Sequence, residues 1–200
     1  MITLRDKAEL VDFISKAAQT NNIKIISVDG IDGCGKTTLA KELVNNLDLT
    51  HINLDEYLIK NKGTYVNYIK YKILKQDISK KLANNKVIII DGICILKVLE
   101  SIKIKSDFKI YVKKLRWGTH WLEGQIIDYS KNVDEVLKTE EETLRKFCEI
   151  NAKIEGKKPG KFVPQESIFQ EIVRYHFEYR PNLNADVIFE RTDDQDLQKI

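Results

Sequence analysis

Residues 28–40 read V-D-G-I-D-G-C-G-K-T-T-L-A. Within them, Gly30, four further residues and then Gly35-Lys36-Thr37 satisfy the phosphate-binding pattern G-x-x-x-x-G-K-[ST]. Residues 23–28, I-K-I-I-S-V, form the short β-branched run of a buried strand. Apolar residues recur at helical spacing after the pattern, at Leu39, Ala40, Leu43, Val44 and Leu47. The stretch therefore predicts a strand, a glycine loop and a helix.

The glycine loop has the chemistry of a polyphosphate site. Glycines let several backbone N–H groups converge on one anion, and a helix that opens near Lys36 adds unsatisfied N–H groups and the positive end of its dipole. Lys36 is expected to reach the β- and γ-phosphates, while the Thr37 hydroxyl ligates Mg²⁺. The ligand is ATP or GTP. The predicted nucleotide-binding residues are Gly30, Ile31, Asp32, Gly33, Cys34, Gly35, Lys36, Thr37 and Thr38.

Length and composition favour one α/β domain that is cytosolic and reduced. The chain has 200 residues, of which 42% are hydrophobic and 32% are charged, which is ordinary for a globular protein. A net charge of +3 is too small to indicate a nucleic-acid or membrane partner. The charged first twenty residues exclude a signal peptide there. Cys34, Cys94 and Cys148 have neither metal-ligand spacing nor a disulfide framework.

Periodicity along the chain predicts helices on both faces of a five-stranded, mainly parallel sheet. A leading helix over residues 3–18, with Thr3 as its N-cap, is expected to cover an edge of the sheet. Further strands are predicted at 51–54, 86–92, 108–112 and 185–189, and further helices at 66–85, 132–154 and 166–177.

Two acids follow predicted strands, where ligands bind in open α/β sheets. Asp91 ends a strand whose apolar run predicts burial on both faces, so we expect it to be the second Mg²⁺ anchor across from Thr37. Asp55 follows strand 51–54 and is either a ligand-binding acid or a turn cap. Tyrosines crowd the next segment, where they either stack on a planar substrate or, as we favour, pack: Tyr57, Tyr65, Tyr68 and Tyr71.

Four blocks together resemble the uridine kinase-like branch of the P-loop kinases, which also includes phosphoribulokinase and pantothenate kinase. They are the glycine loop, N-L-D-E-Y, I-I-I-D-G-I and Y-R-P-N-L-N-A-D-V-I, in the family's order over about residues 23–189. The resemblance implies a three-layer P-loop NTPase sandwich that forms a single kinase domain over 1–200. Its parts would be the leading helix (1–20), a nucleotide- and Mg²⁺-binding core (23–92), a helical lid with C-terminal helices (113–180) and a last strand (185–189).

The resemblance also implies roles for single residues. Asp55 matches the family's acid that accepts the proton of the substrate hydroxyl. Asp91 matches its magnesium-site acid, which is usually Glu. Arg180 and Asp186 match positions near the last strand, where the family packs the nucleotide base. The family's lid is rich in arginine, whereas residues 113–120 contain only Arg116, our candidate for stabilising the transferred phosphate.

The match to uridine kinase is incomplete in the acceptor region. No proline and no P-x-Y-D block occurs in residues 56–86, so uridine itself is in doubt as the acceptor. The loop also resembles that of thymidylate kinase, but the F-P-x-R or R-E-P block and the D-R pair of that family are absent. A hydroxyl acceptor therefore fits better than a nucleotide acceptor.

The function expected from these residues is transfer of the γ-phosphate of ATP, with Mg²⁺, to the hydroxyl of a small molecule. Lys36 and the loop amides hold the phosphates, Mg²⁺ lies between Thr37 and Asp91, and Asp55 deprotonates the acceptor. Two alternatives stay open: a nucleotide-dependent regulatory ATPase or switch, and a non-catalytic ATP-binding module. The acceptor, the choice of ATP or GTP, the lid residues and the oligomeric state, a homo-oligomer included, also stay open.

Overall fold

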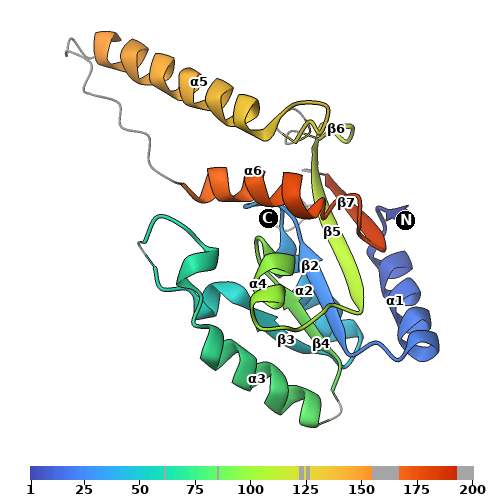
Figure 1. Ribbon diagram of the computed structural model, residues 1–200. Coiled ribbons are helices and arrows are strands. Elements are labelled where there is room, and N and C mark those ends of the chain that lie inside the picture. The colour runs from blue at the N-terminus through green and yellow to red at the C-terminus, as the bar shows by residue number, and fades with distance from the viewer. Residues whose placement is uncertain (61, 85, 122–123, 125–126, 155–166, 193–200) are drawn as a thin grey trace.

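The computed structural model describes residues 1–60, 62–84, 86–121, 124, 127–154 and 167–192. The protein is organised around one mainly parallel sheet. A short strand, β6 (His120–Trp121), pairs antiparallel with β5 outside the main order (Figure 1). The neighbouring parallel strands are, in order, β1 (Ile2–Leu4), β7 (Val187–Thr192), β5 (Phe108–Arg116), β2 (Ile25–Asp29), β4 (Ile88–Asp91) and β3 (Thr50–Asn53).

Helices cover both faces of the sheet and make a three-layer sandwich (Figure 1). On one face lie α1 (Lys7–Asn21) and α2 (Lys36–Asn46). On the other lie α3 (Tyr71–Ala83), α4 (Ile95–Ser101) and α6 (Ile168–Tyr179). The long helix α5 (Val133–Ile154) packs on α6 through its first turns. The predicted fold class, a P-loop NTPase sandwich, is confirmed.

Strand β4, which lies between β2 and β3, shows why the parallel strands are buried on both faces. Ile88 and Ile90 pack into the core on the α3 and α4 side, whereas Ile89 packs into the core on the α1 and α2 side. All three side chains are fully buried, so a continuous apolar run is what this position requires. The register then pairs Asp91 with Val28 on β2 and with Asn53 on β3, which brings three strand ends to one edge.

The prediction for the N-terminus is wrong in its start and in its place. Ile2–Leu4 form β1, and the helix begins at Lys7 with Asp6, not Thr3, as its N-cap; the Asp6 Oδ1 accepts from the Glu9 N–H at 3.0 Å. Strand β1 pairs with β7, whose edge would otherwise be open. Helix α1 covers a face of the sheet rather than its edge, because Leu10 and Ile14 are buried in the α1 and α2 core.

Other predicted elements differ mainly in their bounds. Because β1 and β6 were not predicted, the sheet has more than the five strands expected. The helix predicted at 66–85 is divided into η2 (Val66–Tyr68) and α3, and a further short turn, η1 (Leu54–Tyr57), follows β3. Strand β5 extends to Arg116, and β7 begins at Val187 and runs to Thr192. Helix α5 begins after Asn132, which caps the Asp134 N–H at 2.8 Å.

Two buried tyrosines tie α6 to the sheet. The Tyr175 hydroxyl donates to Asp29 Oδ2 at the end of β2, and the Tyr111 hydroxyl of β5 lies 2.8 Å from His176 Nε2. The His176 Nδ1 is 2.7 Å from the Ile172 carbonyl, so it carries the proton and Nε2 accepts from Tyr111. Desolvation raises the pKa of Asp29 to about 6 and lowers the pKa of His176 to about 4.

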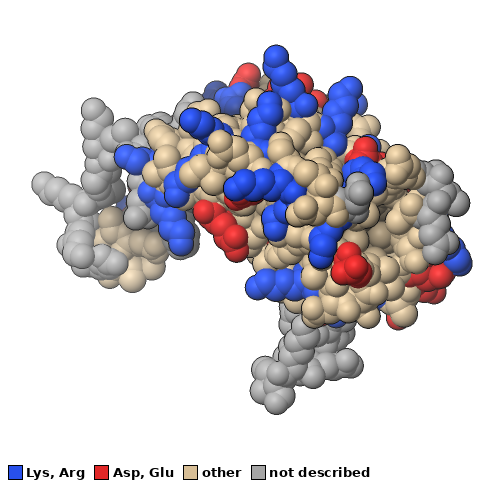
Figure 2. All heavy atoms as spheres, turned by 90° about the horizontal axis from the view of Figure 1, so that it is seen from below, with Lys and Arg blue, Asp and Glu red and all other residues tan. Residues whose placement is uncertain are grey.

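Basic side chains are spread over the face at the amino ends of the strands. Figure 2 views this face and shows Lys and Arg scattered across it, with fewer Asp and Glu between them. Lys24, Lys86 and Lys105, which precede β2, β4 and β5, are exposed. Among the described residues, no helix has the length and apolar character needed to cross a membrane.

A truncation in the buried strand β4 should cost far more stability than the same truncation on the surface. We expect Ile89→Ala to lower the free energy of unfolding by about 3 kcal/mol, because it leaves a cavity beside α2. The matched control is Ile73→Ala, since Ile73 on α3 is 49% exposed; its effect should stay below about 1 kcal/mol. Urea unfolding followed by circular dichroism measures both, and equal losses would contradict the packing described.

Asp29 and His176 should give the free energy of unfolding pH dependences of opposite sign. Between about pH 4 and pH 6, native Asp29 keeps a proton that the unfolded chain has released, so its contribution falls by about 3 kcal/mol as pH rises. Native His176 lacks a proton that the unfolded chain binds up to about pH 6.5, so its contribution increases with pH.

The two opposing contributions are separated by Asp29→Asn. The free energy of unfolding of the variant minus that of the wild type should rise by about 3 kcal/mol from pH 4 to pH 7, because the variant lacks only the Asp29 contribution. Urea unfolding of both proteins across this range measures the difference. A difference that does not change with pH would show that Asp29 titrates normally.

Candidate functional site

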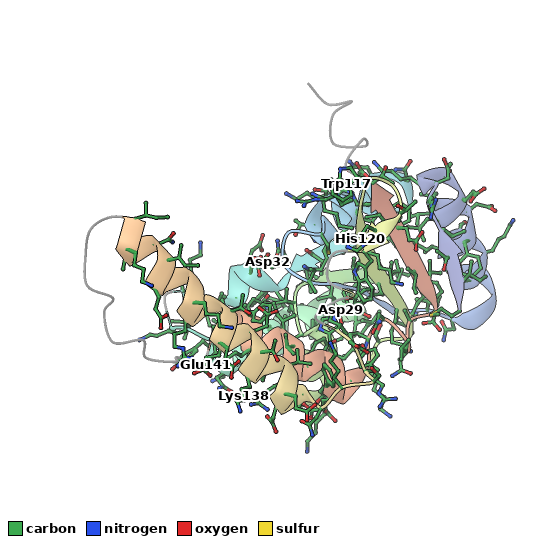
Figure 3. The ribbon with its side chains drawn as sticks, turned by 90° about the horizontal axis from the view of Figure 1, so that it is seen from above. Asp29, Asp32, Trp117, His120, Lys138 and Glu141 are labelled. Atoms are coloured by element: carbon green, nitrogen blue, oxygen red, sulfur yellow. The ribbon has the colours of Figure 1, made fainter. Side chains whose placement is uncertain are left out.

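The candidate site lies where β2, β4 and β3 end. A cavity of about 220 Å³ opens there, and it brings together loop, acid and metal-site residues predicted from separate parts of the chain. Its lining residues are Gly33, Gly35, Lys36, Thr37, Thr38, Asp55, Asp91, Gly92 and Ile93. Figure 3 views this side of the molecule: Asp29 and Asp32 lie between the β5–β6 hairpin, marked by Trp117 and His120, and α5, marked by Lys138 and Glu141.

The loop backbone has a shape that its glycines make possible. Gly30 has φ +144°, and a Cβ there would lie 2.7 Å from both the Cys34 Sγ and the Val112 carbonyl oxygen. Its N–H donates to Asp29 Oδ1 at 2.7 Å, so Gly30 turns the chain while its amide is engaged inside the protein. Gly35, at φ +93°, is the residue from which α2 begins.

Arg191 braces this loop from the far strand β7, and the sequence analysis missed it. Its side chain is largely buried, and Nη1 lies 3.3 Å from the Gly35 carbonyl oxygen. A Cβ on Gly35 would come within 1.6 Å of the same nitrogen. The sequence around Arg191 gives no local signal for this contact, because Gly35 lies 156 residues away along the chain.

Lys36 is held inside the loop. It is the first residue of α2 and is 7% exposed, and its Nζ donates to the Ile31 carbonyl at 2.6 Å. The Cys34 Sγ is 3.9 Å from the same Nζ, and Cys34 is buried. The ammonium group is therefore held inside the loop by a backbone carbonyl and lies near a buried sulfur.

Asp91 lies between Thr37 and His51. The Thr37 hydroxyl donates to Asp91 Oδ2 at 2.5 Å, and the His51 Nε2 lies 2.5 Å from Oδ1. Because Asp91 is 1% exposed, these partners offset the cost of burying its charge. His51 was not predicted; its only sequence signal is a polar ring at the start of a strand next to β4.

The Thr37 and Asp91 pair fits a magnesium ion. Both offer oxygen, the ligand that Mg²⁺ prefers, and Mg²⁺ commonly takes one or two protein oxygens together with phosphates and water. A dedicated protein cage of three or more His, Cys, Asp or Glu side chains is not found in the part of the chain that the structure describes. The pair therefore suits an ion that arrives with a nucleotide.

Asp55 is held at the same cavity by two neighbours. It belongs to η1, immediately after β3, where the Asn53 Oδ1 accepts its backbone N–H at 2.8 Å. The hydroxyl of Tyr65 donates to Asp55 Oδ1 at 2.7 Å, and Tyr65 is 2% exposed. Burial, followed by the charge of Asp55, raises the pKa of the Tyr65 hydroxyl well above its ordinary value, so it stays protonated as a donor.

The tyrosine hydroxyls here bond within the protein. Tyr57 donates to Asp77 Oδ2 at 2.9 Å, and Tyr71 donates to the Val66 carbonyl at 2.7 Å. Together with the Tyr65 contact, these bonds support packing over substrate stacking for the three residues.

Three resemblance-derived residues do not line the cavity. Arg116 is exposed at the end of β5, with its guanidinium 5.5 Å from the centre of the Trp117 ring. Arg180 ends α6 and lies over the Tyr129 ring at 5.6 Å, and Asp186 accepts the Lys109 N–H at 2.8 Å. The role of Arg116 at a phosphate stays a prediction, while Arg180 and Asp186 have structural contacts.

Two further features lie outside this chemistry. Burial raises the pKa of the Cys94 thiol well above its ordinary value, which fits the predicted core role rather than a nucleophile. A larger cavity, of about 470 Å³, lies beside α4 and the start of β5 and includes Leu96, Leu99 and Tyr179. It contains no residue of the glycine loop, so size alone does not mark the chemical site.

Comparison with known proteins adds one family and two solved structures. The NB-ARC domain matches residues 6–88. No curated protein matches the chain. A structure described as a possible uridine kinase from Bacillus stearothermophilus is 14% identical, with 91% of this chain and 98% of that chain covered and a TM-score of 0.49.

The second structure is a provisionally assigned fructose transport system kinase from Silicibacter sp. TM1040. It is 16% identical, with 93% of this chain and 100% of that chain covered and a TM-score of 0.48. The glycine loop, the strand order and the match over residues 6–88 all indicate a P-loop NTPase. The chain has a P-loop NTPase fold with a nucleotide-binding loop.

Proposed function

We propose that the protein is a P-loop kinase, a phosphotransferase that moves the γ-phosphate of ATP to the hydroxyl of a small molecule. One observation carries this proposal: Asp55 lines the same cavity as Lys36, Thr37 and Asp91. A nucleotide switch needs the loop and the metal pair, but phosphoryl transfer to an alcohol also needs an acid beside them that orients the attacking oxygen.

The proposed division of labour follows from where each group lies. Lys36 and the amides of the loop would neutralise the β- and γ-phosphates. Thr37 and Asp91 would hold Mg²⁺, which when bound supplies further positive charge to the phosphate oxygens. Asp55 would accept the proton of the acceptor hydroxyl, and Arg116 is the candidate for additional charge on the transferred group.

The size of the cavity bears on what else the ligands must contact. At about 220 Å³ it is smaller than the roughly 300–1,000 Å³ typical of small-molecule sites, so it suits the phosphates and the reacting hydroxyl. The nucleotide base and the body of the acceptor would then lie outside it. This leaves the acceptor class to be determined from a panel that includes nucleosides and sugars.

A regulatory ATPase is the second candidate, and the NB-ARC match favours it. That match covers the loop and Asp55 but ends at Ile88, before Asp91. In such a protein Asp91 would position a water, and hydrolysis rather than an acceptor would consume ATP. The two candidates differ in one measurable respect, which is whether a small alcohol raises ATP turnover.

The deciding experiment measures ATP consumption with a panel of nucleosides, sugars, pantothenate and other small alcohols. We expect one acceptor class to raise turnover above the background, and Asp55→Asn to reduce that increment by about a hundredfold or more. Background hydrolysis and ATP affinity should change little in this variant. Lys36→Ala should weaken ATP binding and lower both activities, since it removes charge from the phosphates.

The matched control is Asp12→Asn, the same chemical change on the outer surface of α1, where Asp12 pairs with Lys16. It should leave the acceptor-dependent increment intact. Failure of every acceptor to stimulate, together with unchanged slow hydrolysis in Asp55→Asn, would reject the kinase and favour the regulatory ATPase.

A further inference from the structure

A line of hydrogen bonds connects helix α6 to the acid Asp55 through Tyr65. Both carboxylate oxygens of Glu171 accept backbone N–H groups: Oε2 accepts from Tyr65 at 2.5 Å, and Oε1 accepts from Val66 at 3.0 Å. The Tyr65 side chain then donates its hydroxyl to Asp55 Oδ1 at 2.7 Å. These three hydrogen bonds together connect α6, the segment that leads into η2, and the turn after β3.

We infer that Tyr65 is a positioning residue that fixes the carboxylate of Asp55 for catalysis, with Glu171 holding Tyr65 in place. Because Oδ1 receives the Tyr65 hydroxyl, Oδ2 is the oxygen that takes the proton of the acceptor hydroxyl. This inference rests on the proposed kinase function and adds to it a residue that does not touch the substrate.

The physical need for such a residue comes from the position of Asp55. The backbone of Asp55 is fixed by Asn53, but its side chain is exposed at a short turn and would rotate freely about its last torsion. A hydrogen bond from a buried donor restricts that rotation. Proton transfer depends strongly on alignment, so a small misplacement of the accepting oxygen is expected to lower turnover.

Two simpler roles for Tyr65, substrate stacking and packing alone, differ from positioning in what they require of the side chain. At 2% exposure its ring cannot stack on a substrate in this conformation. Packing requires only the ring, whereas the Tyr65 hydroxyl donates at 2.7 Å to Asp55, a carboxylate that lines the cavity. Packing alone predicts that Tyr65→Phe, which keeps the ring, has no effect on turnover.

Helix α6 also reaches the other side of the site. Tyr175 is one turn beyond Glu171, and its hydroxyl bonds Asp29, the residue that in turn accepts the Gly30 N–H of the phosphate loop. One helix, α6, is therefore bonded to the base of the phosphate loop and, through Tyr65, to the acid. The distance between them is thereby set by a single element.

The test is a double-mutant cycle on acceptor-dependent turnover, using wild type, Tyr65→Phe, Asp55→Asn and the double variant. We expect Tyr65→Phe to lower kcat by about tenfold or more, with the KM values for ATP and acceptor changed less than about twofold. In the Asp55→Asn background, the same substitution should have little further effect. Tyr65→Phe should also have little effect in an Asp55→Glu background, because the longer side chain is expected to move the carboxylate away from the Tyr65 hydroxyl.

The matched control is Tyr71→Phe, which also removes one hydroxyl from this segment but breaks a bond to the Val66 carbonyl instead. It should leave kcat close to that of the wild type. Both oxygens of Glu171 accept backbone N–H groups, and Glu171→Gln keeps only one acceptor oxygen. This variant should therefore also lower kcat, as Tyr65→Phe does. Thermal unfolding of every variant checks that the fold is retained.

The outcomes separate this inference from the proposal beneath it. Suppose that the wild type transfers phosphate. If Tyr65→Phe is then as active as the wild type, or if it lowers kcat by the same factor in the wild-type and Asp55→Asn backgrounds, the positioning role is rejected and the kinase function stands. An increase confined to the acceptor KM also rejects it, because Tyr65 would then bind substrate. If the wild type uses no acceptor, the proposed function fails and this inference fails with it.

Discussion

The buried carboxylate of Asp91 is the constraint on which the site depends. Removing a charged group from water is costly unless it gains partners, and here the Thr37 hydroxyl and the His51 ring supply them. Those two residues come from α2 and β3, so the start of the helix and the neighbouring strand must both be in place around β4. The parallel register that pairs Asp91 with Val28 and Asn53 provides that arrangement.

The parts of the structure that the sequence predicts are those with strong local causes. Glycines at Gly30 and Gly35 specify the loop, and the run of isoleucines at 88–90 specifies a strand buried on both faces. The place of Asp55 and Asp91 after two predicted strands indicates both acids, to which the resemblance adds roles, and both line the same cavity. Strand β1 could not be predicted because three residues, two of them exposed, carry little periodicity; the strand forms because it pairs with the open edge of β7.

Contacts between distant residues could not be predicted from spacing. Arg191 meets Gly35 across 156 residues, and Glu171 meets Tyr65 across 106. In each case a side chain satisfies a backbone group, so the identity of the second residue carries no complementary signal. Tyr175 and Asp29 pair through their side chains, but 146 residues separate them in the sequence, so their spacing gives no signal for the contact either. The fold determines which distant residues come into contact, and the types of those residues determine what chemistry is possible there.

The position of β1 has a consequence for how the molecule is made. Ile2–Leu4 pair with Val187–Phe189, and Arg5 bonds Glu190, 185 residues further along the chain. Strand β1 is therefore synthesised long before its partner β7, which also delivers Arg191 to the loop. Contacts of such long sequence separation form slowly because the loop they close is large. A ribosome-bound nascent chain that already contains the whole phosphate motif would have β1 unpaired and its loop without the Arg191 contact until synthesis passes β7.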